Sequence, residues 1–137
     1  MKKTPANFNK IKDFVLGKKY DLSVAFISSA AMRRAMKYKK LSAKKPRRLQ
    51  SKVGVPTKAS GKNDASNVLA FPLSKNSGEI LLCPATARTQ CKAYGMNERV
   101  FVAYLFIHGL LHLRGIPHGV TMERMEHKIA KRFGLRI

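Results

Sequence analysis

At 137 residues, 45% of them hydrophobic, the chain has the length of one domain and enough apolar side chains for a buried core, which excludes a disordered tail. Its 28 Lys and Arg against 7 Asp and Glu give a formal net charge of +21, which favours a polyanionic partner, above all nucleic acid. The longest nearly apolar run, residues 100–113, is too short to span a membrane, and the start does not resemble a signal peptide, so we expect a cytoplasmic protein with no membrane partner.

The first part of the chain predicts a helix, a strand and a second helix. Apolar residues have helical spacing over residues 8–16, and Gly17 ends that helix. The continuous apolar run at residues 22–27 predicts a buried strand. Ser28 or Ser29 can cap the helix that follows.

Residues 37–62 form a basic segment that predicts a loop or a loose hairpin. The segment contains ten basic residues and no acidic one, and two prolines and two glycines interrupt any regular period. Like charges at this density are costly to leave unpaired, so we expect a flexible insertion that contacts nucleic-acid phosphates rather than a solvated surface. The residues expected to make these contacts are Lys39, Lys40, Lys44, Lys45, Arg47 and Arg48.

Two neighbouring strands are predicted next. The stretch NVLAFPL reads as a strand that Pro72 confines to a sheet edge or a strand end, and EILLC reads as its neighbour, after a turn at Ser77 and Gly78. Cys83 and Cys91 have the spacing of neither a redox pair nor a zinc knuckle. We therefore expect ordinary thiols, with Cys83 buried at the end of the strand.

Three helices complete the chain. Helical propensity follows Pro84, and Asn97 can then cap a long helix that is apolar almost all round and must lie in the centre of the domain. Gly115 ends that helix. A final amphipathic helix has Thr121 as its expected cap and ends at Gly134.

Three histidines at the end of the central helix suggest a metal site. His108 and His112 are four residues apart and share one helix face, while Gly115 and Pro117 end the helix and let His118 turn back toward them. Three histidines leave one position of a tetrahedral ion open for water, whereas structural zinc sites are usually closed by four protein ligands. We expect one Zn²⁺ per chain, with nickel or copper as alternatives for the same nitrogens.

Other interpretations of these histidines carry less weight. A lone histidine in an apolar helix is usually a hydrogen-bonded core residue, but the combined pattern is much rarer than its parts. Zinc proteases share the spacing and place Glu after the first histidine as a general base, whereas this chain has Gly109 there. Peptide hydrolysis is therefore not expected, although Glu123 or Glu126 could approach through the fold. We do not expect His127, on the charged last helix, to be a ligand.

The stretch HGLLHLRGIPHG, residues 108–119, resembles the signature His-Gly-x-Leu-His-Leu-x-Gly-Tyr-Asp-His of the YbeY family of metal-dependent endoribonucleases, which act in ribosomal RNA maturation. Ile116 and Pro117 stand where the family has Tyr and Asp. The stretches SNVLAFP and GEILLC and the tail MERMEHKIAKRFGL are also similar to family patterns, so the resemblance covers roughly residues 20–137.

The resemblance implies roles for several residues. The three histidines would bind the metal, and the strand around residues 67–71 would form one wall of a substrate groove. The family's usual Arg has no clear match, and Lys39 is the nearest candidate for its catalytic role. Lys cannot make the bidentate phosphate contact of Arg, and Pro117 removes a carboxylate that could support a ligand.

We predict a single α+β domain over residues 1–137, with a small mixed sheet of three or four strands and the histidine helix packed across it. The expected function is that of a zinc-dependent, single-strand-selective endoribonuclease in ribosomal RNA processing and ribosome maturation. Its partner would be RNA, in particular ribosomal RNA or a ribosomal subunit. The alternative is a metal-stabilised RNA-binding or ribosome-assembly factor without turnover, which the missing Arg and Asp keep open.

Overall fold

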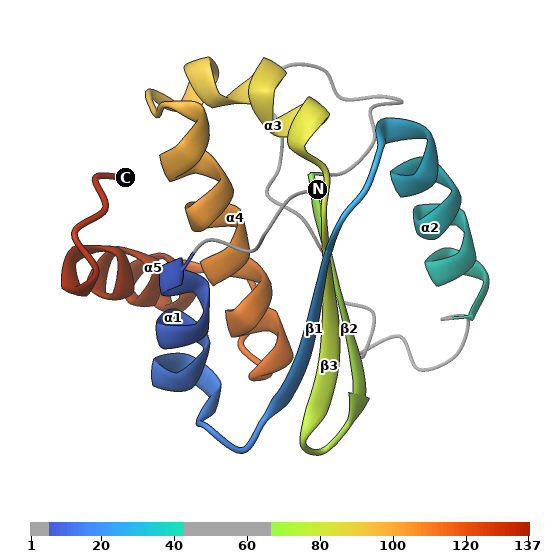
Figure 1. Cartoon of the computed structure of the whole chain (residues 1–137), viewed down its shortest axis with the longest axis horizontal. Coiled ribbons are helices and arrows are strands. Elements are labelled where there is room, and N and C mark those ends of the chain that lie inside the picture. Colours follow the sequence, from blue (N-terminus) through green and yellow to red (C-terminus); the bar gives the residue numbers. More distant parts are fainter. Residues whose placement is uncertain (1–5, 43–66) are drawn as a thin grey trace.

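The computed structural model describes residues 6–42 and 67–137, with side chains described for residues 8–37 and 67–137. Helices and strands alternate early in the chain, and helices follow later (Figure 1). The elements are α1 (Ala6–Leu16), β1 (Asp21–Phe26), α2 (Ser29–Ser42), β2 (Val68–Ser74), β3 (Ser77–Leu82), α3 (Pro84–Gln90), the 3-10 helix η2 (Cys91–Tyr94), α4 (Glu98–Leu113) and α5 (Val120–Arg132).

The three described strands form one mixed sheet in the order β1-β3-β2, which confirms the predicted α+β class. β1 runs parallel to β3, and β2 runs antiparallel to it. The turn between β2 and β3 lies at Lys75 and Asn76, so the prediction of a turn at Ser77 and Gly78 was wrong. The Ser74 hydroxyl favours the earlier turn, because it accepts a hydrogen bond from the Asn76 N–H at 3.2 Å and bonds the Ser77 hydroxyl at 2.8 Å.

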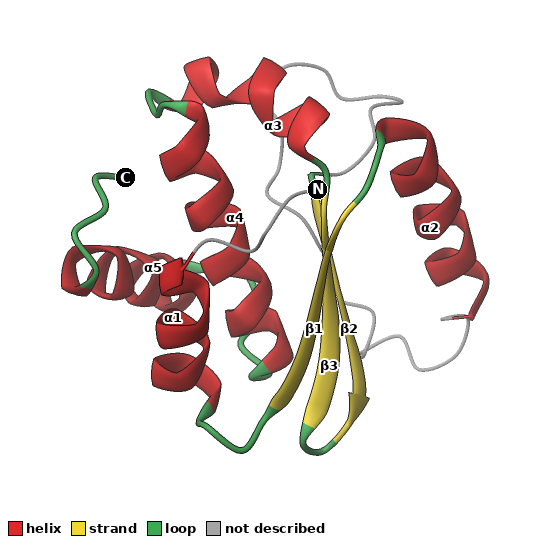
Figure 2. Cartoon of the chain, viewed as in Figure 1, coloured by secondary structure: helices red, strands yellow, loops and turns green. Residues whose placement is uncertain are grey.

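Successive side chains of each strand point to opposite faces of the sheet, and different helices cover these two faces. In Figure 2, α1, α4 and α5 lie on one side of the strands and α2 lies on the other. The larger core lies on the α4 side, where Ile80 and Leu82 of β3 are buried. A smaller cluster of Met32, Leu69 and Cys83 lies between α2 and the other face. Cys83 and Cys91 are both free and buried, which confirms the predicted free thiols and the predicted burial of Cys83.

Two predictions in the first part of the chain were wrong. β1 is half-exposed rather than buried, because it pairs with β3 along one side and forms an edge of the described sheet. Helix α2 continues to Ser42 and so enters the segment 37–62 that was predicted as a loop. The sequence there, KYKKLS, has good helix formers and no Pro or Gly. The rest of that segment lies outside the described residues.

Helix α4 occupies the centre of the described fold, as its apolar sequence predicts. Asn97 caps it as expected, since its Oδ1 accepts a hydrogen bond from the Val100 N–H at 2.9 Å. One side of α4 packs on β2 and β3, and other sides contact α1 and α5. The Phe8 ring of α1 stacks on Phe106 with 3.9 Å between centroids. Among the described helices, none is long and apolar enough to cross a membrane.

Gly109 lies where α4 packs closely against the sheet. A Cβ atom at this position would lie 3.1 Å from Ile80 Cδ1 and 3.4 Å from Val68 Cγ2. This packing gives a structural reason for glycine directly after His108, because any longer side chain would point into the sheet.

We expect Gly109→Val to lower the free energy of unfolding by about 1–3 kcal/mol, since added methyl groups overpack the contact with Ile80 and Val68. Urea unfolding measures this change. Arg99→Val, at an exposed position of the same helix, controls for the helix propensity of valine. Equal stability of Gly109→Val and wild type would show that α4 is not packed against the sheet at this distance.

Candidate metal centre

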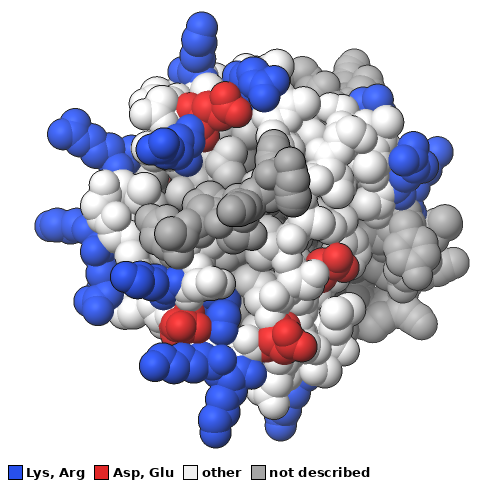
Figure 3. Space-filling model, viewed as in Figure 1, with Lys and Arg blue, Asp and Glu red and all other residues white. Residues whose placement is uncertain are grey.

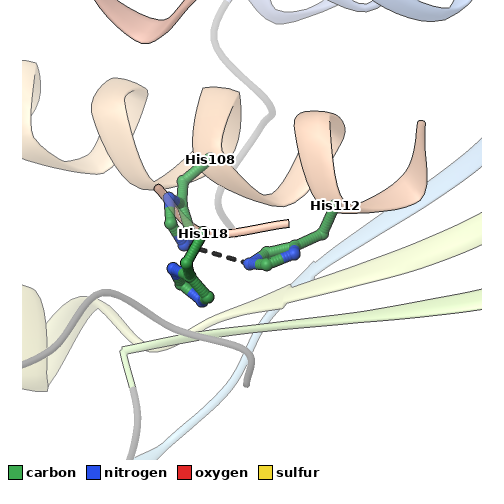
Figure 4. Close-up of side chains that lie close together, drawn as sticks. All are labelled: His108, His112 and His118. Carbon is green, nitrogen blue, oxygen red and sulfur yellow. Dashed lines mark hydrogen bonds between the residues drawn. The ribbon is translucent and has the colours of Figure 1, made fainter. Parts of the chain in front are cut away.

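The structure brings His108, His112 and His118 together into one cluster (Figure 4). Each offers a ring nitrogen, and the three nitrogens lie within 4.8 Å of one another. The Nε2 atoms of His108 and His112 are 3.2 Å apart. Two nitrogens bound to one tetrahedral zinc ion lie about 3.3 Å apart, given zinc–nitrogen bonds of about 2.0–2.1 Å. The donor set therefore fits a single zinc-sized ion.

The end of α4 turns the chain so that His118 faces the other two histidines. The Ile116 N–H bonds the Leu111 carbonyl at 3.0 Å, and the Gly115 N–H bonds the His112 carbonyl at 2.9 Å. These two bonds form a Schellman motif, whose turn residue here is Gly115, with a φ of 92°. The predicted end of the helix is thus confirmed, and the motif tethers His118 within a short loop.

A second glycine returns the chain into α5 directly after His118. Gly119 has a φ of 146°, a conformation that residues with a Cβ rarely adopt, and it is the N-cap of α5. The helix begins at Val120, so the prediction of Thr121 as its cap was wrong, and Thr121 lies in the first turn. Because Gly119 has no side chain, α5 begins without a side-chain hydrogen bond from its N-cap residue.

Glu126 of α5 supports His108 from behind. Its Oε2 lies 2.5 Å from His108 Nδ1, and both residues are only 3% exposed. Because a carboxylate accepts hydrogen bonds, the His108 Nδ1 carries the proton, and its Nε2 presents a lone pair toward His112. Carboxylates in this position fix the tautomer and ring orientation of a histidine ligand. Glu126 would therefore prepare His108 to bind a metal ion.

Tyr104 completes this buried hydrogen-bonded group. It lies on α4, one turn before His108. Burial raises the pKa of the Tyr104 hydroxyl, and the negative charge of Glu126 and a hydrogen bond to that residue raise it further. The hydroxyl thus stays protonated and donates to Glu126. With donors from Tyr104 and His108, the Glu126 carboxylate has the partners that a buried charge needs.

A signal for the role of Glu126 is present in the sequence, where it was predicted only as a residue that could approach the histidines through the fold. Met122 and Ile129, which lie four residues before and three residues after Glu126, are buried and belong to the core face of α5. A glutamate in that periodic pattern must find a buried partner, and the partner becomes visible only when α5 packs on α4. His127, at the neighbouring exposed position, lies outside the cluster.

The other residues that the sequence predicted to take part in function lie outside this cluster or outside the described residues. Asn67 is fully buried, and its Nδ2 donates to Gln90 Oε1 at 2.8 Å, so its side chain is part of the core. The backbones of Lys39 and Lys40 belong to the last part of α2, while their side chains are not described. Beyond the described residues lie Lys44, Lys45, Arg47 and Arg48.

Comparisons with known proteins agree on one family. A family model described as Endoribonuclease YbeY matches residues 54–134, a span that includes all three histidines and Glu126. Proteins named Endoribonuclease YbeY are 35% identical in Bdellovibrio bacteriovorus (78 residues, 56% of this chain and 49% of that protein) and 35% identical in Nitrosomonas europaea (82 residues, 54% and 50%). One from Caldanaerobacter subterraneus subsp. tengcongensis is 26% identical over 139 residues, with 85% and 75% covered. The matches span about half the length of the first two relatives.

We expect Glu126→Gln to weaken zinc binding roughly 10- to 100-fold, because an uncharged amide no longer fixes the His108 tautomer. Competition with a zinc-binding dye measures the affinity. Glu123→Gln, on the exposed face of the same helix, removes an equal charge and should leave the affinity nearly unchanged. Identical zinc affinities in all three proteins would contradict the role assigned to Glu126.

Proposed function

This chain belongs to the Endoribonuclease YbeY family, and on that premise we propose that it is a metal-dependent endoribonuclease that cleaves single-stranded RNA. The observation that supports this proposal most strongly is the convergence of His108, His112 and His118 on a space that suits one metal ion. We further propose that the ion is Zn²⁺, one per chain, and that the substrate is ribosomal RNA during ribosome maturation.

The three histidines would supply three neutral nitrogen ligands and leave one coordination position open. A bound zinc ion would act as a Lewis acid on the phosphate and make a water molecule more acidic. Neutral ligands do not offset the charge of the ion, so the site favours an anionic substrate such as a phosphodiester. Three imidazoles with an open position suit zinc, while nickel and copper could occupy the same donors.

Gly109 argues against peptide hydrolysis at this site. The residue after the first histidine carries the general base of zinc proteases with this spacing. In this fold that position faces Ile80 and Val68 of the sheet rather than the histidine cluster. A carboxylate there would be buried against apolar side chains, so this packing does not accommodate the general base of a zinc protease.

Single-stranded RNA is the favoured substrate on chemical grounds. The net charge of +21 attracts a polyanion, and a single strand can bend its backbone into a site between α4 and the following loop. A duplex holds its phosphates at fixed geometry. We retain, from the sequence, the proposal that the following residues contact phosphates: Lys39, Lys40, Lys44, Lys45, Arg47 and Arg48.

A non-catalytic RNA-binding or ribosome-assembly factor is the second candidate. Pro117 stands where the family has Asp, and the family's usual Arg has no clear match in this sequence. In that case the metal would hold α4, the loop and α5 together, without turnover.

The two candidates are separated by His112→Ala. We expect this change to remove most of the metal and abolish RNA cleavage, because two imidazoles make a poor site, while RNA affinity stays within about twofold. Metal analysis, a cleavage assay and a binding titration measure the three quantities, and Arg99→Ala, at an exposed position of the same helix, is the control. If wild type freed of contaminating nucleases cuts no RNA at any metal loading, the binding-factor proposal replaces the enzyme.

Lys39 is proposed to replace the missing Arg in transition-state stabilisation. We expect Lys39→Ala to lower kcat roughly tenfold or more with little change in KM, because a contact made only in the transition state does not affect substrate binding. Lys40→Ala should instead raise KM, since a phosphate contact outside the reaction binds ground state and transition state alike. Equal effects of the two variants on kcat would remove the special role of Lys39.

A further inference from the structure

We propose that the outward face of α5 binds the phosphate backbone of the single-stranded RNA that occupies the metal centre. This basic face of α5 consists of Arg124, His127, Lys128 and Lys131. The inference rests on the proposed function, because it assigns a path to the same substrate. It also adds a second binding surface, formed by residues that the sequence had not predicted to contact RNA.

The four residues lie on one side of α5, opposite its core face. The buried residues of this helix are Met122, Glu126, Ile129 and Ala130. All four residues of the basic face are exposed, and together with Val120 and Glu123 they line an open groove of about 490 Å³. Arg124, Lys128 and Lys131 follow one another at helical spacing, so they form a row about 10 Å long. A row of this length can contact successive phosphates of one strand.

The charges on this face are not accounted for by the fold. Arg124, Lys128 and Lys131 make no ion pair with any described residue, although the Glu123 carboxylate lines the same groove. Like charges four apart on a helix repel each other. The helix dipole favours Lys131 near the C-terminus but disfavours Arg124 near the N-terminus. An anionic partner would offset both costs.

Figure 3 shows Lys and Arg side chains standing out from the edge of the molecule where α5 lies in Figure 1. They extend freely into solvent, where a flexible polyanion can reach them. An RNA backbone suits a linear row of separate cations better than a compact anion does.

The basic face begins where the metal centre ends. His118 of the centre and Val120 of the groove are separated by Gly119 alone, so their Cα atoms lie at most about 7 Å apart. Val120 is 63% exposed and offers an apolar surface on which a base or ribose can rest. Single-strand binding sites combine cations along the backbone with such contacts to the bases. A strand held at the histidines would therefore pass directly onto α5.

The test neutralises the row in the full-length protein with Arg124→Gln, Lys128→Gln and Lys131→Gln together. Glutamine keeps helix propensity, and circular dichroism confirms folding. Binding of an unstructured 12-nucleotide RNA is measured against salt concentration, with a chelator present to prevent cleavage. The slope of log affinity against log salt should flatten by about 2, at roughly 0.7 per lost contact, and affinity at 0.1 M salt should fall roughly 10- to 100-fold. With metal restored, KM in RNA cleavage should rise by a similar factor.

The matched control is Lys18→Gln, Lys19→Gln and Lys75→Gln, which removes the same charge from exposed positions on other elements. The control should keep nearly the wild-type slope. An unchanged slope in the α5 variant, or an equal loss in the control, would overturn the proposal. So would unchanged RNA affinity together with lost binding to polyglutamate, which would point to an acidic protein partner.

The outcomes also separate this inference from the proposed function. If wild type cleaves RNA and the α5 variant keeps the wild-type slope, the enzyme stands and the α5 surface fails. If wild type never cleaves RNA but the slope loss is specific to α5, the RNA surface stands and the enzyme fails.

Discussion

The buried hydrogen bond between His108 and Glu126 holds the functional end of this fold together. A carboxylate that is 3% exposed is costly unless charges or donors satisfy it, and here His108 Nδ1, at 2.5 Å, and the Tyr104 hydroxyl do so. The same bond joins α4 to α5 and so restricts the conformations of the short loop between them. Since His118 lies in that loop, its position depends on a contact that His108 and Glu126 make and in which His118 takes no part.

The close packing of α4 on the sheet is the second constraint. Gly109 lets the helix axis approach β2 and β3 until a Cβ atom would meet Ile80 at 3.1 Å. The helix is buried around most of its surface, so His108 and His112 are presented from a rigid element rather than from a mobile one. Position 109, which carries the general base in zinc proteases with this spacing, is therefore occupied here by a glycine that packs against the sheet. Neighbouring positions of α4 therefore serve two purposes: Gly109 packs against the sheet, and His108 and His112 form part of the histidine cluster.

Local sequence signals predicted most of the helices and both strands of the hairpin, because caps, glycines and periodicity act over a few residues. Asn97, Gly115 and the i, i+4 histidines are examples. Predictions failed where the answer depends on distant partners or competing local signals. The half-exposed state of β1 follows from strand order, the pairing of Glu126 with His108 spans 18 residues, and Gly119 took the cap position expected for Thr121. The burial of β1 and the pairing of Glu126 could therefore not be predicted from the sequence alone.

The claim on which the proposals converge is that the three histidines hold one metal ion with an open coordination position. Titration of metal-free protein with Co²⁺, followed by visible absorption and RNA cleavage in the same samples, tests it most directly. We expect saturation at one equivalent, the strong visible bands typical of tetrahedral Co²⁺, and cleavage that rises in proportion to the bound ion. Weak octahedral absorption with no saturable site, or cleavage that is independent of the bound ion, would contradict this account of the centre.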